Sequence, residues 1–256
     1  MGIRGLLLKC FGRSFGIMAQ DATERQQADK IITPGMPQLV REVAADGAVL
    51  LENTVLPFNA GARVSVFGRT QIDYFCAGYG SGGDVNTPYK TGLLDGLCAC
   101  EDIVVNPELA DIYREWVAQN PAVHGDWGTW PRSHPEMNIS DETVAKVAQF
   151  GDNAVVVIGR SSGEDRDCVL EQGSYYITDE ELDLLGKVSS HFANTVVVLN
   201  IGCIIDMSWV SSFKLGAVLI AWQGGMESGN AIADILCGKV SPSGRLTDTI
   251  AKKYED

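Results

Sequence analysis

The chain has 256 residues, of which 45% are hydrophobic and 21% are charged. These proportions exclude a disordered, collagen-like or coiled-coil protein and fit one large globular domain or two small ones. The formal net charge of −13 argues against a nucleic-acid-binding protein, because such proteins present a basic face to the phosphates. A neutral or cationic small molecule is a better-matched ligand.

The N-terminal segment lies outside the periodic patterns of the rest of the chain. Residues 1–20 carry three basic residues and no acid, and their apolar stretch at residues 5–8 is too short for a signal peptide. We expect residues 1–28 to be a disordered or non-native extension, with a basic targeting segment as the alternative. No apolar run reaches the roughly 18 residues of a membrane span, so no membrane partner is expected.

Cysteine and histidine usage predicts neither a disulfide framework nor a metal site. The cysteine count is odd and no C-x-x-C pair occurs, which favours free thiols in a reducing, cytoplasmic setting. The histidines also lack metal-ligand spacing, and we expect no cofactor. The residues concerned are Cys10, Cys76, Cys98, Cys100, Cys168, Cys203 and Cys237, with His124, His134 and His191.

The first half of residues 29–256 alternates helical and strand-like patterns. Apolar residues at helical spacing between Met36 and Ala44 predict a helix, and a short apolar run follows at residues 48–51. Residues 62–68 alternate and end in glycine, as a strand entering a loop would. Helix-like segments follow near residues 91–100 and 107–118.

The second half contains three continuous, β-branched-rich runs, at residues 153–158, 195–201 and 216–222. Continuous rather than alternating apolar character predicts strands buried on both faces. A capping box at Thr178-Asp-Glu-Glu181 opens one intervening helix, and residues 227–236 form another. The predicted fold is therefore α/β, a mostly parallel sheet flanked by helices on both faces in a three-layer αβα sandwich. Ligands in such sheets bind beyond the carboxyl ends of the strands.

The loop after the run at 153–158 concentrates charge at one strand end. Residues 159–168 hold three acids and two arginines. A carboxylate beside apolar walls can have its pKa raised and act as a general acid, whereas a neighbouring arginine keeps a carboxylate ionised. A solvated charged loop without chemistry is the plainer interpretation.

The same loop contains Gly159-x-Ser161-x-Gly163, which matches the nucleophile elbow of serine hydrolases. Two features argue against that interpretation. The elbow should lead straight into a helix, but residues 164–173 are polar and irregular. The triad histidine should come late in the chain, yet His191, the only candidate, precedes the next strand. A serine hydrolase using Ser161 stays open as an alternative.

A second loop, at residues 78–83, is rich in glycine but lacks the lysine and hydroxyl residue of a P-loop. Flexible backbone close to a ligand, or simple turn formation, explains it better than nucleotide binding. The aromatic residues between 113 and 130 could stack on sugars, although packing is the commoner role of such side chains.

Four stretches in chain order resemble the α/β-sandwich domain of glycoside hydrolase family 3. They are Val64–Phe75 continued by Gly78–Val85, Val156–Arg166, Leu199–Trp209, and Trp222–Leu236 continued by Gly238–Thr249. The resemblance covers roughly residues 40–250. It implies a β-glucosidase or a related hydrolase of terminal β-linked sugars, acting with retention of configuration through two carboxyl groups.

The resemblance assigns roles to three residues. Glu164, in Ser162-Gly163-Glu164, matches the position that the family uses as general acid/base, and Asp165 and Arg166 would bind substrate or orient the loop. Many members have extra residues between this glutamate and the Asp-Arg pair, which are contiguous here. Alignment on Asp165-Arg166 instead would put Ser162 at the catalytic position.

The resemblance also implies a partner domain. The family's nucleophile is an aspartate on a (β/α)₈ barrel of roughly 250 residues, for which we find no room here. We therefore expect residues 29–256 to be the sandwich domain alone, a fragment that is inactive by itself and works with a barrel in cis or in trans on a β-linked glycoside or oligosaccharide. A non-catalytic carbohydrate-binding or interaction module is the alternative from another functional class.

Overall fold

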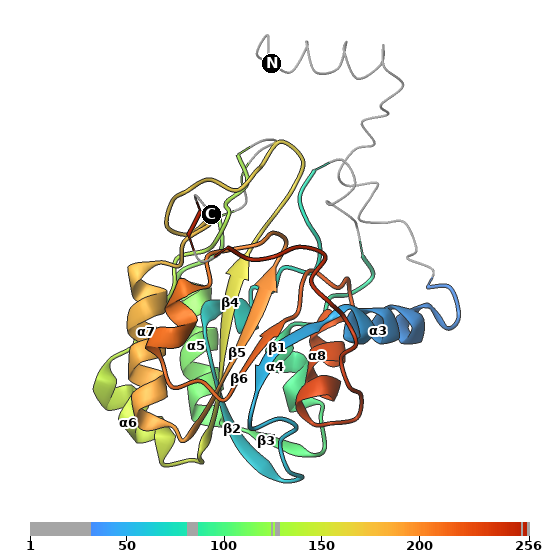
Figure 1. Cartoon of the computed structure of the whole chain (residues 1–256). Coiled ribbons are helices and arrows are strands. Elements are labelled where there is room, and N and C mark those ends of the chain that lie inside the picture. The colour runs from blue at the N-terminus through green and yellow to red at the C-terminus, as the bar shows by residue number, and fades with distance from the viewer. Residues whose placement is uncertain (1–31, 81–86, 124, 126–128, 252, 255–256) are drawn as a thin grey trace, which may run out of the picture.

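A computed structural model describes residues 32–80, 87–123, 125, 129–251 and 253–254 (Figure 1). Six strands form one sheet in the order β1-β6-β5-β4-β2-β3. Neighbouring strands are parallel except at one edge, where β1 runs antiparallel to β6. The strands are β1 (Val49–Asn53), β2 (Ala62–Phe67), β3 (Ile103–Val105), β4 (Asn153–Arg160), β5 (Asn194–Ile201) and β6 (Ala217–Ile220).

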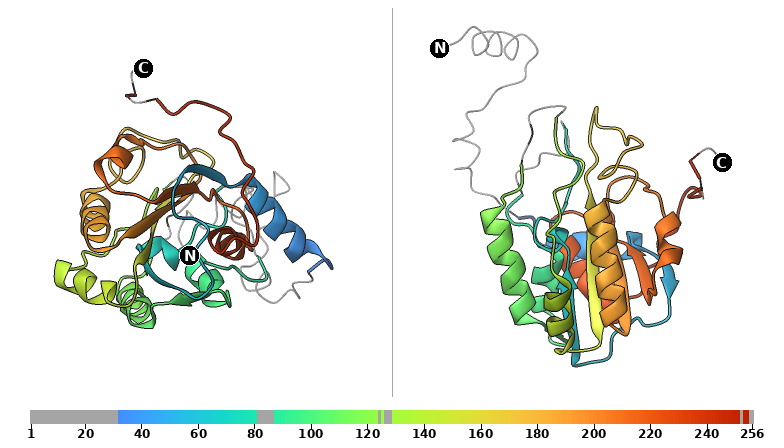
Figure 2. Two further views of the ribbon diagram at one scale, coloured as in Figure 1. Left: turned by 60° about the horizontal axis from the view of Figure 1, so that its bottom comes forward. Right: turned by 90° about the vertical axis from the view of Figure 1, so that its left-hand side faces the viewer.

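Helices cover both faces of this sheet (Figures 1 and 2). One face packs against α3, α4 and α8, and the other against α5, α6 and α7, so two separate apolar cores lie on either side of the sheet. The predicted three-layer sandwich is confirmed. The helices are α3 (Met36–Gly47), α4 (Leu93–Cys98), α5 (Pro107–Gln119), α6 (Asp141–Ala148), α7 (Asp179–His191) and α8 (Ser228–Leu236).

The central strands show why their sequences are continuously apolar. In β4, Val155 and Val157 belong to the core under α3, α4 and α8, while Val156 and Ile158 belong to the core under α5, α6 and α7. Successive side chains of a strand point to opposite faces, so a strand covered on both faces needs an apolar residue at every position.

The helix starts follow the predicted capping signals. Thr178 Oγ1 accepts from the backbone N–H of Glu181, and the Glu181 carboxylate accepts from the N–H of Thr178, which completes the capping box of α7. Ser140 caps α6 with a single bond, in which its Oγ accepts from the N–H of Thr143. Each cap satisfies backbone donors that a helix leaves unpaired in its first turn.

Helix α3 forms as predicted, but its apolar residues face differently from what the spacing suggested. Ala44 and Ala45 are buried, whereas Met36, Leu39 and Val43 are 41%, 55% and 61% exposed. The helix contacts α8, and Arg41 near its middle pairs with Asp234. The periodicity therefore identified the helix but not the face that it buries.

The loops that follow β2, β4, β5 and β6 leave the sheet at its carboxyl edge, which is the upper edge in Figure 1. None of the helices in the described ranges has the length and apolar character needed to cross a bilayer. Residues 1–28, for which we expected an extension, lie outside the described residues.

Candidate active site

A buried arginine closes the end of strand β4. Arg160 has no solvent exposure, and its guanidinium makes a bidentate ion pair with Glu181 of α7 at 2.7 and 2.6 Å. The same guanidinium donates to the backbone carbonyls of Gly159, Ser174 and Tyr176 at 2.7, 3.1 and 3.3 Å. All five donors of the side chain are used, which is the condition under which a buried charge is tolerated.

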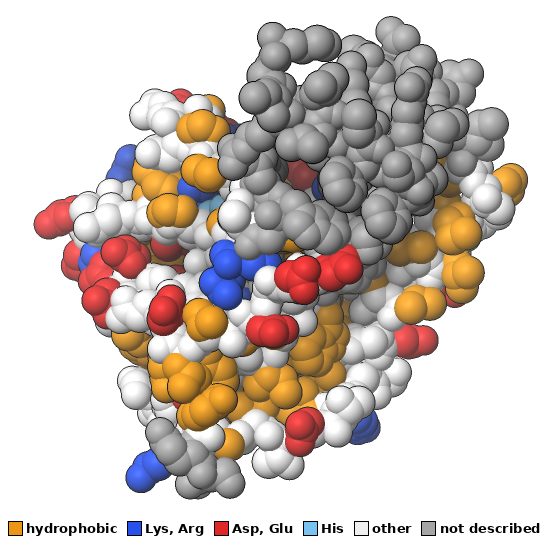
Figure 3. Space-filling model, turned by 90° about the horizontal axis from the view of Figure 1, so that it is seen from above, with side chains coloured by type: hydrophobic (Ala, Val, Ile, Leu, Met, Phe, Trp, Pro, Cys, Tyr) orange, Lys and Arg blue, Asp and Glu red, His pale blue; other side chains and the backbone are white. Residues whose placement is uncertain are grey.

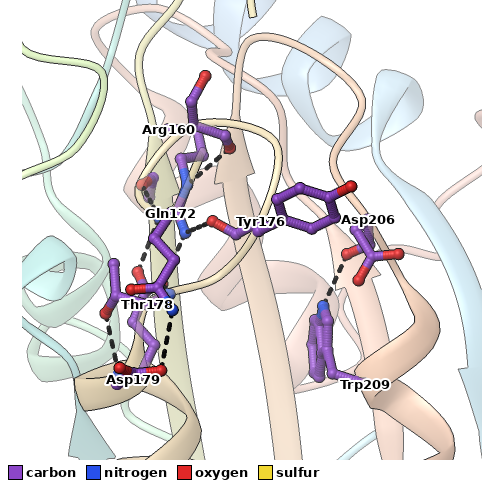
Figure 4. Close-up of polar contacts among 10 residues, drawn as sticks. Arg160, Gln172, Tyr176, Thr178, Asp179, Asp206 and Trp209 are labelled. Atoms are coloured by element: carbon purple, nitrogen blue, oxygen red, sulfur yellow. Dashed lines mark hydrogen bonds and ion pairs between the residues drawn. The ribbon is translucent and has the colours of Figure 1, made fainter. Parts of the chain in front are cut away.

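This pairing differs from the one suggested by the sequence, in which Arg160 was one of two arginines among the acids of residues 159–168. The arginine turns inward to Glu181. Its bond to the carbonyl of Tyr176 fixes the returning arm of the segment between β4 and α7, residues 161–178, hereafter the β4–α7 segment (Figure 4). Gln172 donates to Asp179 at 2.9 Å, which adds a second attachment to α7. The carboxylates of the β4–α7 segment therefore do not pair with this guanidinium, whose donors are all used elsewhere.

The β4–α7 segment is also fastened to the loop after β5. The backbone N–H of Asp206 donates to the carbonyl of Tyr175 at 2.8 Å, and the indole N–H of Trp209 donates to the carbonyl of Asp206 at 2.7 Å (Figure 4). Cys168 and Cys203 are joined as a disulfide between the same two loops. The expectation of free thiols is wrong for this pair, because folding brings together two cysteines that lie 35 residues apart in the sequence.

The three residues singled out by the resemblance lie together at the tip of the β4–α7 segment. Glu164 and Asp165 are exposed, and Arg166 is partly buried. Asp165 has φ 58°, a left-handed conformation that turns the chain sharply between its neighbours. The Nε of Arg166 donates to the carbonyl of Trp130 at 2.8 Å, which attaches the tip to a third loop.

The glycine-rich loop lies directly beside Glu164. Tyr79 forms a parallel bridge with Gly163, in which the N–H of Glu164 donates to the carbonyl of Tyr79 at 3.1 Å. Gly80 has φ 116°, and a Cβ there would come within 2.6 Å of the Cβ of Glu164. Glycine is therefore required for this approach of the two loops. Residues 81–86, the rest of the loop, lie outside the described residues.

A cavity of about 350 Å³ opens beside this loop. Asp73, Tyr79, Lys90 and His134 contribute polar or aromatic groups to its wall, so both signs of charge are represented. Seen from above the carboxyl edge, acidic and basic side chains are interspersed on the described part of this face, with apolar side chains beside them (Figure 3). A pocket of mixed charge with aromatic walls is suited to a neutral, hydroxyl-rich ligand.

Aromatic pairs frame the cavity. The ring of Tyr79 stacks on Trp130 with centroids 5.5 Å apart, and Phe75 stacks on His134 at 5.1 Å. Tyr113, by contrast, is fully buried in the core, as the packing interpretation of the aromatic residues predicted. Trp127 lies outside the described residues.

The sequence analysis did not identify a set of polar contacts that includes Asp73 of the cavity wall. Arg69 donates to Asp73 at 2.6 Å and to the carbonyl of Asn120 at 2.7 Å. Glu136 accepts from the backbone N–H groups of Arg69 and Met137, both at 2.8 Å, and burial raises the pKa of Glu136 to about 7. The contacts of Arg69 with Asn120 and with Glu136 join residues 51 and 67 positions apart, so no local pattern could reveal them.

The described residues do not assemble a serine-hydrolase triad around Ser161. Its hydroxyl donates to the carbonyl of Pro131. His191 lies at the C-terminal end of α7 and contacts Asp141 of α6 at 2.9 Å. The chain after Ser161 enters an irregular segment rather than a helix, contrary to what a nucleophile elbow requires.

The fold and the loops at this edge define an α/β-sandwich domain in which a carboxylate-bearing loop is paired to one wall of a pocket. Residues 48–256 match the model of the glycosyl hydrolase family 3 C-terminal domain. The chain belongs to glycoside hydrolase family 3.

Individual relatives agree with this assignment. The chain is 43% identical to a beta-glucosidase of Ruminococcus albus, over 84% of this chain and 23% of that protein. It is 35% identical to beta-glucosidase A of Butyrivibrio fibrisolvens, over 86% of this chain and 29% of that protein. The chain therefore spans about a quarter of the length of these relatives.

Solved structures give the same result. A beta-glucosidase from Paenibacillus barengoltzii matches 89% of this chain and 25% of its own, with a TM-score of 0.86 and 44% identity. Beta-glucosidase 3B from Thermotoga neapolitana, solved in complex with glycerol, matches 86% of this chain and 31% of its own, with a TM-score of 0.76 and 32% identity.

Proposed function

We propose that this chain is the sandwich domain of a retaining β-glucosidase and that Glu164 is its general acid/base. In this scheme Glu164 protonates the oxygen of the departing group, and its carboxylate then activates water. The attacking carboxylate comes from a (β/α)₈ barrel domain, in cis or in trans, because retention requires a second carboxyl group about 5–5.5 Å from the first. The substrate is a glycoside or oligosaccharide with a terminal β-linked sugar.

One observation carries the proposal. The loop of Glu164 is paired through its backbone to the glycine-rich loop at Tyr79, next to a cavity at the carboxyl edge of the sheet. An exposed carboxylate on an anchored loop can reach a ligand held between this domain and another one. The buried ion pair of Arg160 and the disulfide at Cys168 hold the segment's arms, so its tip keeps a defined position.

The proposed function can be tested in a chimera. Residues 48–256 of this chain would replace the matching part of the Ruminococcus albus beta-glucosidase, and hydrolysis of aryl β-glucosides would be measured. The unfused 256-residue chain should show no turnover. In the chimera, Glu164→Gln should lower kcat for substrates with poor leaving groups by roughly 10²–10⁴-fold, the usual contribution of general acid/base catalysis.

Glu171→Gln is the matched control, because Glu171 is an exposed carboxylate farther along the same segment. Activated substrates, whose leaving groups need no proton, should depend far less on Glu164 in the first step. Azide, a nucleophile that needs no general base, should restore turnover to Glu164→Gln and form a β-glucosyl azide. If Glu164→Gln and Glu171→Gln behave alike, Glu164 is not the acid/base.

The carbohydrate-binding alternative rests on the aromatic pairs at the cavity. Titration of the chain with glucose, followed by NMR, would show shifts confined to Tyr79, Trp130 and the loops next to them if the domain binds sugar alone. Binding by the chain together with an inactive chimera would favour the binding module over the hydrolase.

A further inference from the structure

Two cysteines and an aspartate converge at the opposite edge of the sheet. The Sγ atoms of Cys100 and Cys237 and a carboxylate oxygen of Asp102 all lie within 4.8 Å of one another. In a tetrahedral zinc site, two thiolates bound at 2.3 Å are separated by about 3.8 Å. The three ligand atoms therefore need to close by no more than about 1 Å to share one metal ion.

The backbone that carries these side chains is well anchored. Cys100 follows α4, and its N–H donates to the carbonyl of Leu97. Asp102 immediately precedes β3, and its carbonyl accepts from the N–H of Gly61. Cys237 is the C-cap of α8, which packs against α4 (Figure 1). Three ligands from two packed elements form a prearranged cluster, which the sequence could not reveal because the cysteines are 137 positions apart.

A cationic side chain already lies beside this cluster. The ammonium group of Lys239 lies 3.7 Å from Cys100 Sγ and 3.9 Å from a carboxylate oxygen of Asp102. The Lys239 side chain is 45% exposed, so it can swing into solvent without disturbing the core. The cluster therefore already holds a positive charge. Lys239 supplies that charge and can move away from the cluster.

We propose that Cys100, Asp102 and Cys237 form a site for a thiophilic divalent cation of the zinc type. Two thiolates and one carboxylate are a donor set that zinc accepts, and water would complete the tetrahedron. Binding releases two thiol protons and displaces the ammonium of Lys239 from the cluster. The bound ion links the turn between α4 and β3 to the end of α8, at the edge of the sheet remote from Glu164.

The test uses the whole chain with the Cys168–Cys203 disulfide intact and the other thiols reduced, with Co²⁺ as the probe. Binding should produce thiolate-to-cobalt charge-transfer absorption with the visible bands of tetrahedral cobalt, at one ion per chain, and Zn²⁺ should abolish both. Cys100→Ser with Cys237→Ser should remove the charge-transfer band. Asp102→Asn should weaken binding at least about 10-fold. Cys98→Ser, which changes an exposed cysteine outside the cluster, should leave binding unchanged.

Lys239→Met gives a test that a merely structural cluster would not pass. Removing the competing ammonium should tighten Co²⁺ binding about two- to fivefold, the range expected for a half-exposed ion pair. Asp102→Asn and Lys239→Met both alter partly exposed side chains, so they remain informative if the double cysteine variant fails to fold. A spectrum without charge transfer at stoichiometric cobalt would overturn the proposal, as would affinities that ignore Asp102 and Lys239.

Discussion

Replacing Arg160 by methionine tests whether one buried ion pair holds the β4–α7 segment in place. The change removes both hydrogen bonds to Glu181 and those to the carbonyls of Gly159, Ser174 and Tyr176. Breaking a buried pair by removing one partner costs about 3–5 kcal/mol, because the remaining charge is left without a counter-ion. Since domains of this kind unfold at 5–15 kcal/mol, we expect a folded variant that is less stable by about 4 kcal/mol.

The double variant Arg160→Met with Glu181→Leu isolates the cause. Glu181→Leu alone should also cost about 3–5 kcal/mol, because Arg160 is then unpaired. The double variant leaves no unpaired charge at this position, so its loss should fall about 2–3 kcal/mol short of the sum of the two single losses. Urea unfolding followed by circular dichroism gives each free energy of unfolding, provided that the m values agree.

Arg114→Met supplies the exposed control, because Arg114 pairs with Asp111 while 50% of its side chain is exposed. Such a pair contributes at most about 1 kcal/mol. Equal losses in the two arginine variants, or strictly additive losses in the double variant, would refute the assignment of Arg160 as the anchor.

Three further changes have defined outcomes. Gly96→Ala should lower the melting temperature through a loss of about 1–3 kcal/mol, because its Cβ would lie 2.3 Å from the carbonyl oxygen of Gly229; Gly47→Ala, with open space around it, is the control. Because burial raises the pKa of Glu136 to about 7, its stabilising contribution should be complete below about pH 4.5 and decline as the pH rises to about 7. Glu136→Gln should flatten that decline in urea midpoints measured across this range. Cys203→Ser should lower stability by about 3–4 kcal/mol, the chain-entropy value for a loop of this length, and should abolish the effect of reductant on unfolding.

The sandwich was predictable because its signals are local. Continuous apolar runs marked the central strands, and the residues at Thr178 and Ser140 marked helix starts through side-chain-to-backbone bonds within four residues. Such features depend on short spans of chain, so a single sequence displays them fully. The face that α3 buries depends instead on where α8 lies, and the apolar spacing alone did not give it.

The candidate site was predictable only in part. The strand order brings the loops of Glu164 and Tyr79 to one edge, which the parallel topology led us to expect. The partner of Arg160 was not foreseeable, because six acids lie between Arg160 and Glu181 in the sequence. Disulfide connectivity between Cys168 and Cys203 is likewise a property of the folded chain rather than of cysteine spacing.

Anchoring of the β4–α7 segment by one guanidinium has an evolutionary consequence. The hydrogen bonds of Arg160 secure the start of the segment at Gly159 and its return at Ser174 and Tyr176. Insertions or deletions between these stems would alter the rim of the cavity without displacing β4 or α7. The shape of the cavity rim can thus change while β4 and α7 stay in place. This stretch is therefore the natural place to graft loops from relatives of other selectivity.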